Sequence, residues 1–293
     1  MDSNTITNGS TTVLSKRAIT TTVLQPSRGW AAIRLKEFIE YIELLYFFTW
    51  RDIKVLYKQT VLGFTWAIIN PVFHMIIFSV VFGSLAKIDS DGVPYPIFSY
   101  TALIPWTFFA TSLTFSSLSL VSASGMIGKI YFPRIILPLA ATLARLMDFS
   151  ISFIVLIILM FYYHIVPTWN ALALPLLIVI VILTASGMGI WLSALAVQYR
   201  DIKHASQFVV QLLMYCAPVV WPVSKIAEKW PHLRLPYGLY PMAGVIEGFR
   251  ASLIGTTPMP WDLIAVGGCS ALVIFVSGLF FFYRMERYFA DVA

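Results

Sequence analysis

The residue types that hold metal ions are present in this chain but widely scattered. The four histidines show no paired spacing of the kind that metal sites use. The two cysteines, Cys216 and Cys269, both fall in apolar stretches, where they suit helix packing better than a disulfide or a metal site. We therefore expect no metal ion and no catalytic constellation.

One glycine-rich segment faintly resembles a phosphate-binding loop. Residues 125–130 read Gly-Met-Ile-Gly-Lys-Ile, but they lack the glycine four residues before Gly128 and a Ser or Thr after Lys129. The chain is therefore predicted not to bind ATP by this motif, so any ATPase must be a separate chain. Arg145 and Asp148 are spaced to pair on one helix face, which favours a structural ion pair.

A basic segment ends abruptly where an apolar stretch begins. Arg51, Asp52, Lys54 and Lys58 are followed by no full charge until Lys87. Cations at such a boundary lie at the depth of lipid headgroups. Two interpretations stay open, namely contact with a substrate phosphate and ordinary anchoring to lipid.

The composition excludes an ordinary soluble domain. The chain has 293 residues, of which 59% are hydrophobic and 12% charged, with a mean hydropathy of +0.81. Soluble domains carry about 25% charged residues. The net charge of +6 is concentrated beside apolar stretches, which favours membrane lipids over nucleic acid.

The apolar pattern predicts an all-α integral membrane protein with six transmembrane helices. An amphipathic interface helix is expected at 33–60, and short re-entrant helices between the last two spans, at 223–261, where five prolines, with Pro222 just before them, exclude a full span. Residues 1–30 are predicted to be a disordered tail, 31–285 the transmembrane domain and 286–293 a cytoplasmic C-terminus. The spans are expected at about 62–86, 97–121, 138–163, 171–197, 205–222 and 262–283.

Lys and Arg residues predict the orientation. They are abundant before the first span, and the loops at 122–134 and 198–204 hold two each. The intervening loops hold Lys87 alone or none. Because cytoplasmic loops carry the excess of positive residues, both termini are predicted to be cytoplasmic.

Aromatic residues make up 15% of the chain. Most are explained by the aromatic belts that membrane proteins place at the bilayer interfaces. Some could instead line a channel, because flat rings stack on sugar faces and their polar tips bond to hydroxyls. The candidates for such stacking are Tyr100, Trp106, Trp221 and Tyr240.

Four segments together resemble a known family. They are the hinge at 51–71, the Lys-Ile-Tyr-Phe-Pro-Arg stretch at 129–134 with Leu-Pro-Leu at 137–139, Tyr-Arg-Asp-Ile at 199–202, and the proline-containing runs at 218–222 and 239–242. In this order they resemble the membrane-spanning subunit of bacterial ABC transporters that export polysaccharide, a family that includes O-antigen, capsule and teichoic-acid exporters.

The resemblance implies a homodimer of six-span subunits in the bacterial inner membrane, with two ABC ATPase subunits. It implies that this chain holds no cofactor and that the partner ATPase binds ATP and Mg²⁺. It also implies that the substrate is a lipid-linked polysaccharide, with O-antigen as the first candidate. Carried over by position, Phe132, Pro133, Arg134, Arg200 and Asp201 contact the ATPase.

The resemblance also assigns a gate helix at the interface. Its residues in this sequence are Arg51, Asp52, Lys54, Lys58 and Trp66. The helix is expected to lead directly into the first span.

Three other functions stay open from the sequence. A membrane-embedded enzyme acting on lipid-linked sugars needs paired carboxylates or a histidine, and no such spacing is visible. An ion-driven transporter needs several charges near the midplane, where only Arg145 and Asp148 are candidates. An exporter of a small lipid or drug is compatible with the same motifs.

Overall fold

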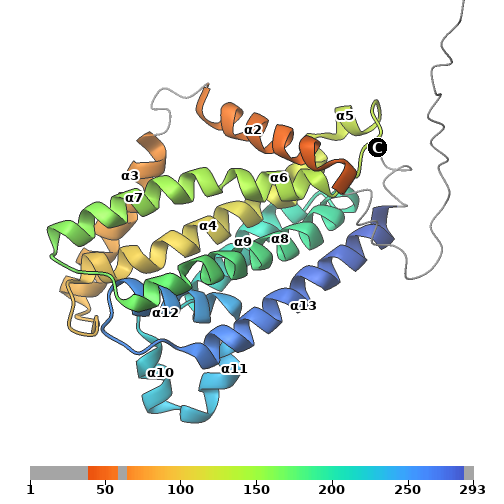
Figure 1. The fold of residues 1–293 in the computed structure, drawn as a ribbon. Coiled ribbons are helices and arrows are strands. Elements are labelled where there is room, and N and C mark those ends of the chain that lie inside the picture. The colour runs from red at the N-terminus through yellow and green to blue at the C-terminus, as the bar shows by residue number, and fades with distance from the viewer. Residues whose placement is uncertain (1–38, 59–64, 287–293) are drawn as a thin grey trace, which may run out of the picture.

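The computed structural model describes residues 39–58 and 65–286, and their regular elements are all helices. The predicted tail at 1–30 and all but the first residue of the predicted 286–293 segment lie outside these ranges. The interface helix predicted at 33–60 corresponds to α2 (Ile42–Lys58). Figure 1 shows α2 lying across the outside of a bundle of longer helices.

Within the described residues, five helical segments are long and apolar enough to cross a membrane. Each agrees with a predicted span to within about three residues. They are α3 with a terminal π-helical segment (Thr65–Leu85), α4 (Tyr95–Ser122), α6 with α7 (Ile136–Tyr162), η2 with α8 (Trp169–Gln198) and α13 (Trp261–Met285).

The third of these segments consists of two helices. α6 (Ile136–Ala144) ends at Arg145, and α7 (Leu146–Tyr162) continues from it. The break leaves the Arg145 guanidinium beside Asp148 rather than in contact with lipid.

The span predicted at 205–222 is not among the five. The helix there, α9 (Ile202–Cys216), has 15 residues, a length of about 22 Å, which is less than the roughly 30 Å of a bilayer core. It ends because Pro218 disfavours helical backbone at Ala217, which is extended.

α4 is the central helix of the bundle. It contacts α3, α6, α7, α8, α9 and α12, and the hydrophobic core forms around its buried rings. In the most apolar 18-residue stretch of α4, 61% of the residues are buried, whereas in that of the first span 11% are buried. The first span is therefore a peripheral helix with most of its apolar surface exposed.

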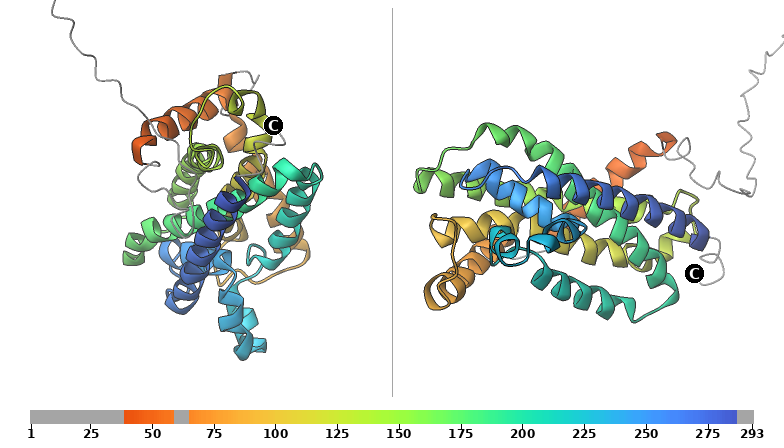
Figure 2. Two further views of the ribbon diagram at one scale, coloured as in Figure 1. Left: turned by 90° about the vertical axis from the view of Figure 1, so that its right-hand side faces the viewer. Right: turned by 90° about the horizontal axis from the view of Figure 1, so that it is seen from below.

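The segment after α9 folds as short helices, as its prolines predict. They are α10 (Val223–Lys229), η3 (Pro231–Leu233), α11 (Arg234–Gly238) and α12 (Pro241–Leu253). α10 and α11 project from the bundle, whereas α12 lies within it (Figures 1 and 2). α12 is buried throughout and packs against α13 so closely that a Cβ on Gly244 would lie 2.7 Å from the Leu263 carbonyl oxygen. The depth of these helices in a membrane stays a prediction.

Candidate functional site

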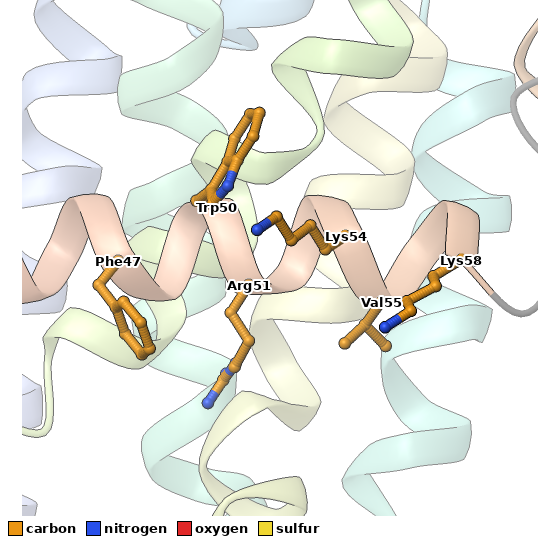
Figure 3. Close-up of a pocket in the computed structure, with 6 residues that line it drawn as sticks. All are labelled: Phe47, Trp50, Arg51, Lys54, Val55 and Lys58. Atoms are coloured by element: carbon orange, nitrogen blue, oxygen red, sulfur yellow. The ribbon is translucent and has the colours of Figure 1, made fainter.

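The outer face of α2 carries the cations that the sequence singled out. They project together with three apolar side chains (Figure 3), and these residues line a shallow pocket whose volume is about 340 Å³. The lining residues are Phe47, Trp50, Arg51, Lys54, Val55 and Lys58. We call this surface the basic face of α2.

The cations of the basic face are not equivalent. Arg51 donates from Nε and Nη2 to the same oxygen of Asp52, at 3.0 and 2.8 Å, and its guanidinium lies over the Phe48 ring. Lys54 lies over the Trp50 ring, 5.4 Å from its centroid, and neither Lys54 nor Lys58 has a carboxylate partner among the described residues. The two lysines are therefore the uncompensated charges of this face.

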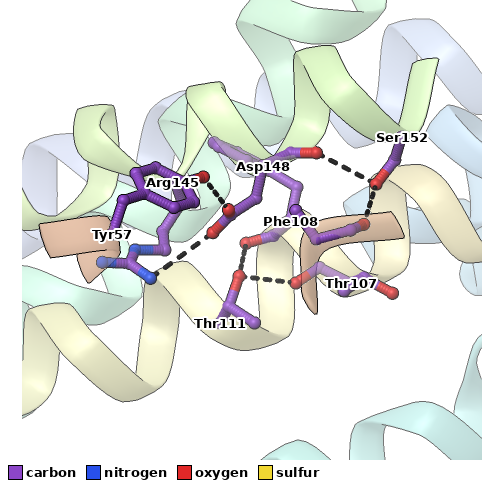
Figure 4. Close-up of polar contacts among 8 residues, drawn as sticks. Tyr57, Thr107, Phe108, Thr111, Arg145, Asp148 and Ser152 are labelled. Atoms are coloured by element: carbon purple, nitrogen blue, oxygen red, sulfur yellow. Dashed lines mark hydrogen bonds and ion pairs between the residues drawn. The ribbon is translucent and has the colours of Figure 1, made fainter. Parts of the chain in front are cut away.

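The inner side of α2 is tied to the bundle by a polar cluster, drawn in Figure 4. The Tyr57 hydroxyl donates to Oδ1 of Asp148, and Arg145 Nη1 lies 3.4 Å from Oδ2 of the same carboxylate. Burial, and then the bond to Asp148, raise the pKa of Tyr57, so its phenol stays protonated and donates. The predicted Arg145–Asp148 pair is confirmed, and the structure adds Tyr57 to it.

The predicted ATPase-coupling stretch lies at the same end of the bundle as the α8–α9 turn and the end of α13 (Figures 1 and 2). Phe132 is 5% exposed and packs edge-on against Phe48 of α2, with ring centroids 5.5 Å apart. Arg134 Nη1 lies 3.5 Å from the Glu286 carbonyl oxygen. Tyr131, the residue before Phe132, is exposed. Phe132 thus joins this stretch to α2.

The other predicted coupling residues lie at the α8–α9 turn. Arg200 and Asp201 are exposed, and the Asp201 carbonyl accepts the first backbone hydrogen bonds of α9 from His204 and Ala205. Pro133 is half-buried beside Phe132. Their contact with an ATPase stays a prediction.

The four aromatic candidates for glycan stacking lie mostly in the interior of the protomer. Tyr100 is fully buried and donates to the Ser152 carbonyl at 3.2 Å, and Trp106 is 4% exposed. Tyr240 donates to the Leu213 carbonyl, and the Trp221 carbonyl accepts from Arg250. In this arrangement Tyr100 and Trp106 offer no free ring face, so stacking on a glycan stays a prediction that requires the core to open. By contrast Trp66, at the start of α3, is 53% exposed.

A second buried ion pair was missed from the sequence. Arg250 is 2% exposed and contacts Glu247 at 3.3 Å, the Val219 carbonyl at 2.8 Å and the face of the Phe98 ring. These contacts fix α12 to the segment that follows α9. The same three-residue spacing that revealed Arg145 and Asp148 could have revealed this pair.

Among the residues that the structure describes, no three His, Cys, Asp or Glu side chains gather as metal ligands would. The helices instead bring together two features at one end of the bundle. One is the basic face of α2, and the other is the exposed part of the 122–134 loop with the α8–α9 turn.

Comparison with known proteins places this arrangement in a family. The ABC-2 type transporter family model matches residues 43–254. The chain is 27% identical over 263 residues to the O-antigen export system permease protein RfbA of Klebsiella pneumoniae, covering 89% of this chain and 99% of that protein. It is 26% identical over 259 residues to RfbA of Myxococcus xanthus, covering 87% and 98%, and 23% identical over 192 residues to the polysialic acid transport protein KpsM of Escherichia coli, covering 62% and 72%. The chain belongs to the ABC-2 type transporter family.

Proposed function

We propose that this chain is the permease subunit of an ATP-driven transporter that exports a lipid-linked polysaccharide across the bacterial inner membrane. O-antigen is the first candidate for this polysaccharide. The observation that carries the proposal is the match to proteins named O-antigen export permease over nearly their whole length. A relative named for polysialic acid transport supports the broader class of glycan substrate.

The proposed assembly is a homodimer with six crossings in each subunit and both termini in the cytoplasm. The first span supports a second copy, because its apolar surface is left largely exposed by its own protomer. In this arrangement α9 and the turn at 217–222 complete the fifth crossing, and the short helices α10 to α12 lie at the outer leaflet.

The proposed energy source is a separate ABC ATPase that binds ATP and Mg²⁺. Exposed residues of the 122–134 loop and the α8–α9 turn form the contact with it. The Phe48–Phe132 contact gives a route for motion from that loop to α2, because the two rings pack directly on each other. Movement of α2 then reaches Asp148 in the bundle through Tyr57.

The basic face of α2 is the proposed contact for the phosphate of the lipid carrier. Lys54 and Lys58 carry this role, because Arg51 is already neutralised by Asp52. We expect Lys54→Gln with Lys58→Gln to lower export severalfold while the protein still assembles with its ATPase. Arg51→Gln is the matched control and should have the smaller effect. Equal export by the double variant and the native protein would reduce these lysines to lipid anchors.

Deletion of the gene in its native host tests the function itself. Surface polysaccharide should disappear while lipid-linked polysaccharide accumulates inside the cell, and a plasmid copy should restore export. A variant of the ATPase that cannot hydrolyse ATP should give the same accumulation. Unchanged surface glycan with no intracellular accumulation would refute the proposed function.

A further inference from the structure

A cavity of about 360 Å³ lies between the end of α2 and the start of α3, beside the cluster of Tyr57, Arg145 and Asp148. We call it the hinge cavity. Residues of α2, α3, α4 and α7 line it, and the exposed Trp66 ring borders it. The cavity therefore touches both the gate helix and the bundle.

The charges in the hinge cavity cancel. Asp148 accepts from Tyr57 and pairs with Arg145, so the three groups together are neutral. Arg145 also lies over the Phe115 ring, with its guanidinium carbon 4.1 Å from the centroid, so the ring face meets part of its charge. The cavity is therefore poorly suited to a phosphate, in contrast to the basic face of α2.

The hydrogen-bonding groups that remain are those that bind sugars. Each carboxylate oxygen of Asp148 has a further lone pair for a hydroxyl donor. The Asn70 amide and the Thr107 hydroxyl line the cavity and make no hydrogen bond to another described residue. With Trp66 they offer donors, acceptors and an aromatic face, the combination that recognises a polyol with apolar ring faces.

We propose that the hinge cavity binds one sugar ring, the ring nearest the carrier in the lipid-linked glycan. The inference rests on the proposed function and deepens it. Its size is in the range of small-molecule sites, which begins at about 300 Å³. In a lipid-linked glycan the phosphate joins the lipid to the first sugar. Lys58 on the basic face and Tyr57 in the cavity are adjacent in α2 and project about 100° apart, so the long Lys58 side chain can reach a phosphate joined to a sugar that is held beside Tyr57.

Photo-crosslinking of the full-length chain in a detergent without sugar tests the proposal. The probes are octyl β-glycosides of glucose, galactose and rhamnose that carry a diazirine beside the anomeric oxygen. An octyl tetraoxyethylene with the same diazirine is the head-group control. At least one glycoside should label peptides that contain Asn70, Thr107 or Asp148, and excess unlabelled octyl glycoside should compete.

Two variants and a matched control give the specificity. Asn70→Ala and Thr107→Val each remove one bond to the sugar and should lower labelling about five-fold. Thr114→Val changes the same residue type on α4 outside the cavity and should label as the native protein does. Because Asn70 and Thr107 side chains bond to no described residue, both variants should unfold at the native temperature, which separates lost binding from lost fold.

Equal labelling by the tetraoxyethylene probe, or native labelling of both cavity variants, would overturn the proposal. Absence of labelling by all three glycosides would do the same. These outcomes are independent of the deletion experiment. A strain that loses export while the purified protein shows no sugar labelling would keep the exporter and discard the sugar site.

Discussion

Within the described ranges two arginines are buried, and each has a carboxylate three residues away along the chain. Arg145 shares Asp148 with Tyr57, whereas Arg250 adds two backbone carbonyls and an aromatic ring to Glu247. A buried charge is tolerated only when its partners replace the lost water. The first pair borders a cavity and a helix that is proposed to move, and the second fixes the outer segment.

Loss of the Arg250 charge should be more harmful than loss of the whole ion pair. Arg250→Met leaves Glu247 buried without its partner and should cost about 3–5 kcal/mol of unfolding free energy. Combining it with Glu247→Gln removes the stranded charge and should recover part of that cost. Thermal unfolding in detergent, compared across the double-mutant cycle, measures the coupling. Additive effects of the two substitutions would show that the pair makes no direct contribution.

Asp91, in the loop between the first two spans, lies where the ionised form of its carboxyl group is disfavoured. Burial, and then the neighbouring Asp89, raise the pKa of Asp91, although Arg250 and Lys225 act in the opposite direction. A pKa raised in the folded state means that ionisation of Asp91 costs folding free energy above that pKa, and the cost vanishes as pH falls through it.

Asp91→Asn should therefore stabilise the protein slightly at pH 7, by up to about 0.5 kcal/mol, and have no effect near pH 3. Asn also suits the positive φ of 52° at this position. The matched control, Asp89→Asn, loses the 3.2 Å contact with Lys225 and should destabilise slightly at pH 7. Unfolding temperatures measured across this pH range check both signs, and a stabilisation by Asp91→Asn that grew on acidification would contradict the argument.

At the scale of the helices, α8 and α13 pack backbone against backbone. A Cβ on Gly187 would lie 2.7 Å from the Phe275 Cα, and one on Gly278 would lie 2.7 Å from the Gly187 carbonyl oxygen. Such contacts are between backbones, so neither helix can yield without moving as a whole. Small residues allow this close approach in membrane bundles.

Gly187→Val should separate α8 from α13 and lower the yield of folded protein severalfold. Gly268→Ala on α13 is the control, because its added Cβ would meet Ile180 at 3.5 Å, an ordinary contact. Fluorescence-detected size-exclusion chromatography of tagged variants measures the folded fraction. Native yield from Gly187→Val would mean that the two helices are not packed this closely.

Helix positions could be predicted from the sequence better than the contacts between helices. The predicted spans at 97–121 and 262–283 match α4 and α13 because a run of about 20 uncharged, mostly apolar residues leaves few alternatives to a helix in lipid. Pro218 predicts the early end of α9, whereas the span predicted at 205–222 runs past it. The bond from Tyr57 to Asp148 joins residues 91 positions apart, so no spacing rule could reveal it.

At the scale of the whole molecule, α2 connects the two ends of the proposed mechanism. Phe48 contacts the predicted coupling stretch, and Tyr57, near the other end of the helix, contacts Asp148 in the bundle. The basic face and the hinge cavity lie on different sides of its last two turns. A displacement of α2 would therefore change both proposed substrate contacts at once.

The number of crossings decides whether the short helices after α9 lie on the outer or the cytoplasmic side of the membrane. If α9 and the turn at 217–222 complete a fifth crossing, Lys203 and Lys229 lie on opposite sides of the membrane, and both are exposed for labelling. Cysteine is introduced at each position in turn, after Cys216 and Cys269 are replaced by serine. A membrane-impermeant maleimide should label Lys229→Cys in intact spheroplasts, but Lys203→Cys only in inside-out vesicles. Labelling of both positions from the same side of the membrane would mean that the described chain crosses only with its five long spans. The sixth crossing would then be wrong, and so would the proposed location of α10 and α11 on the outer side.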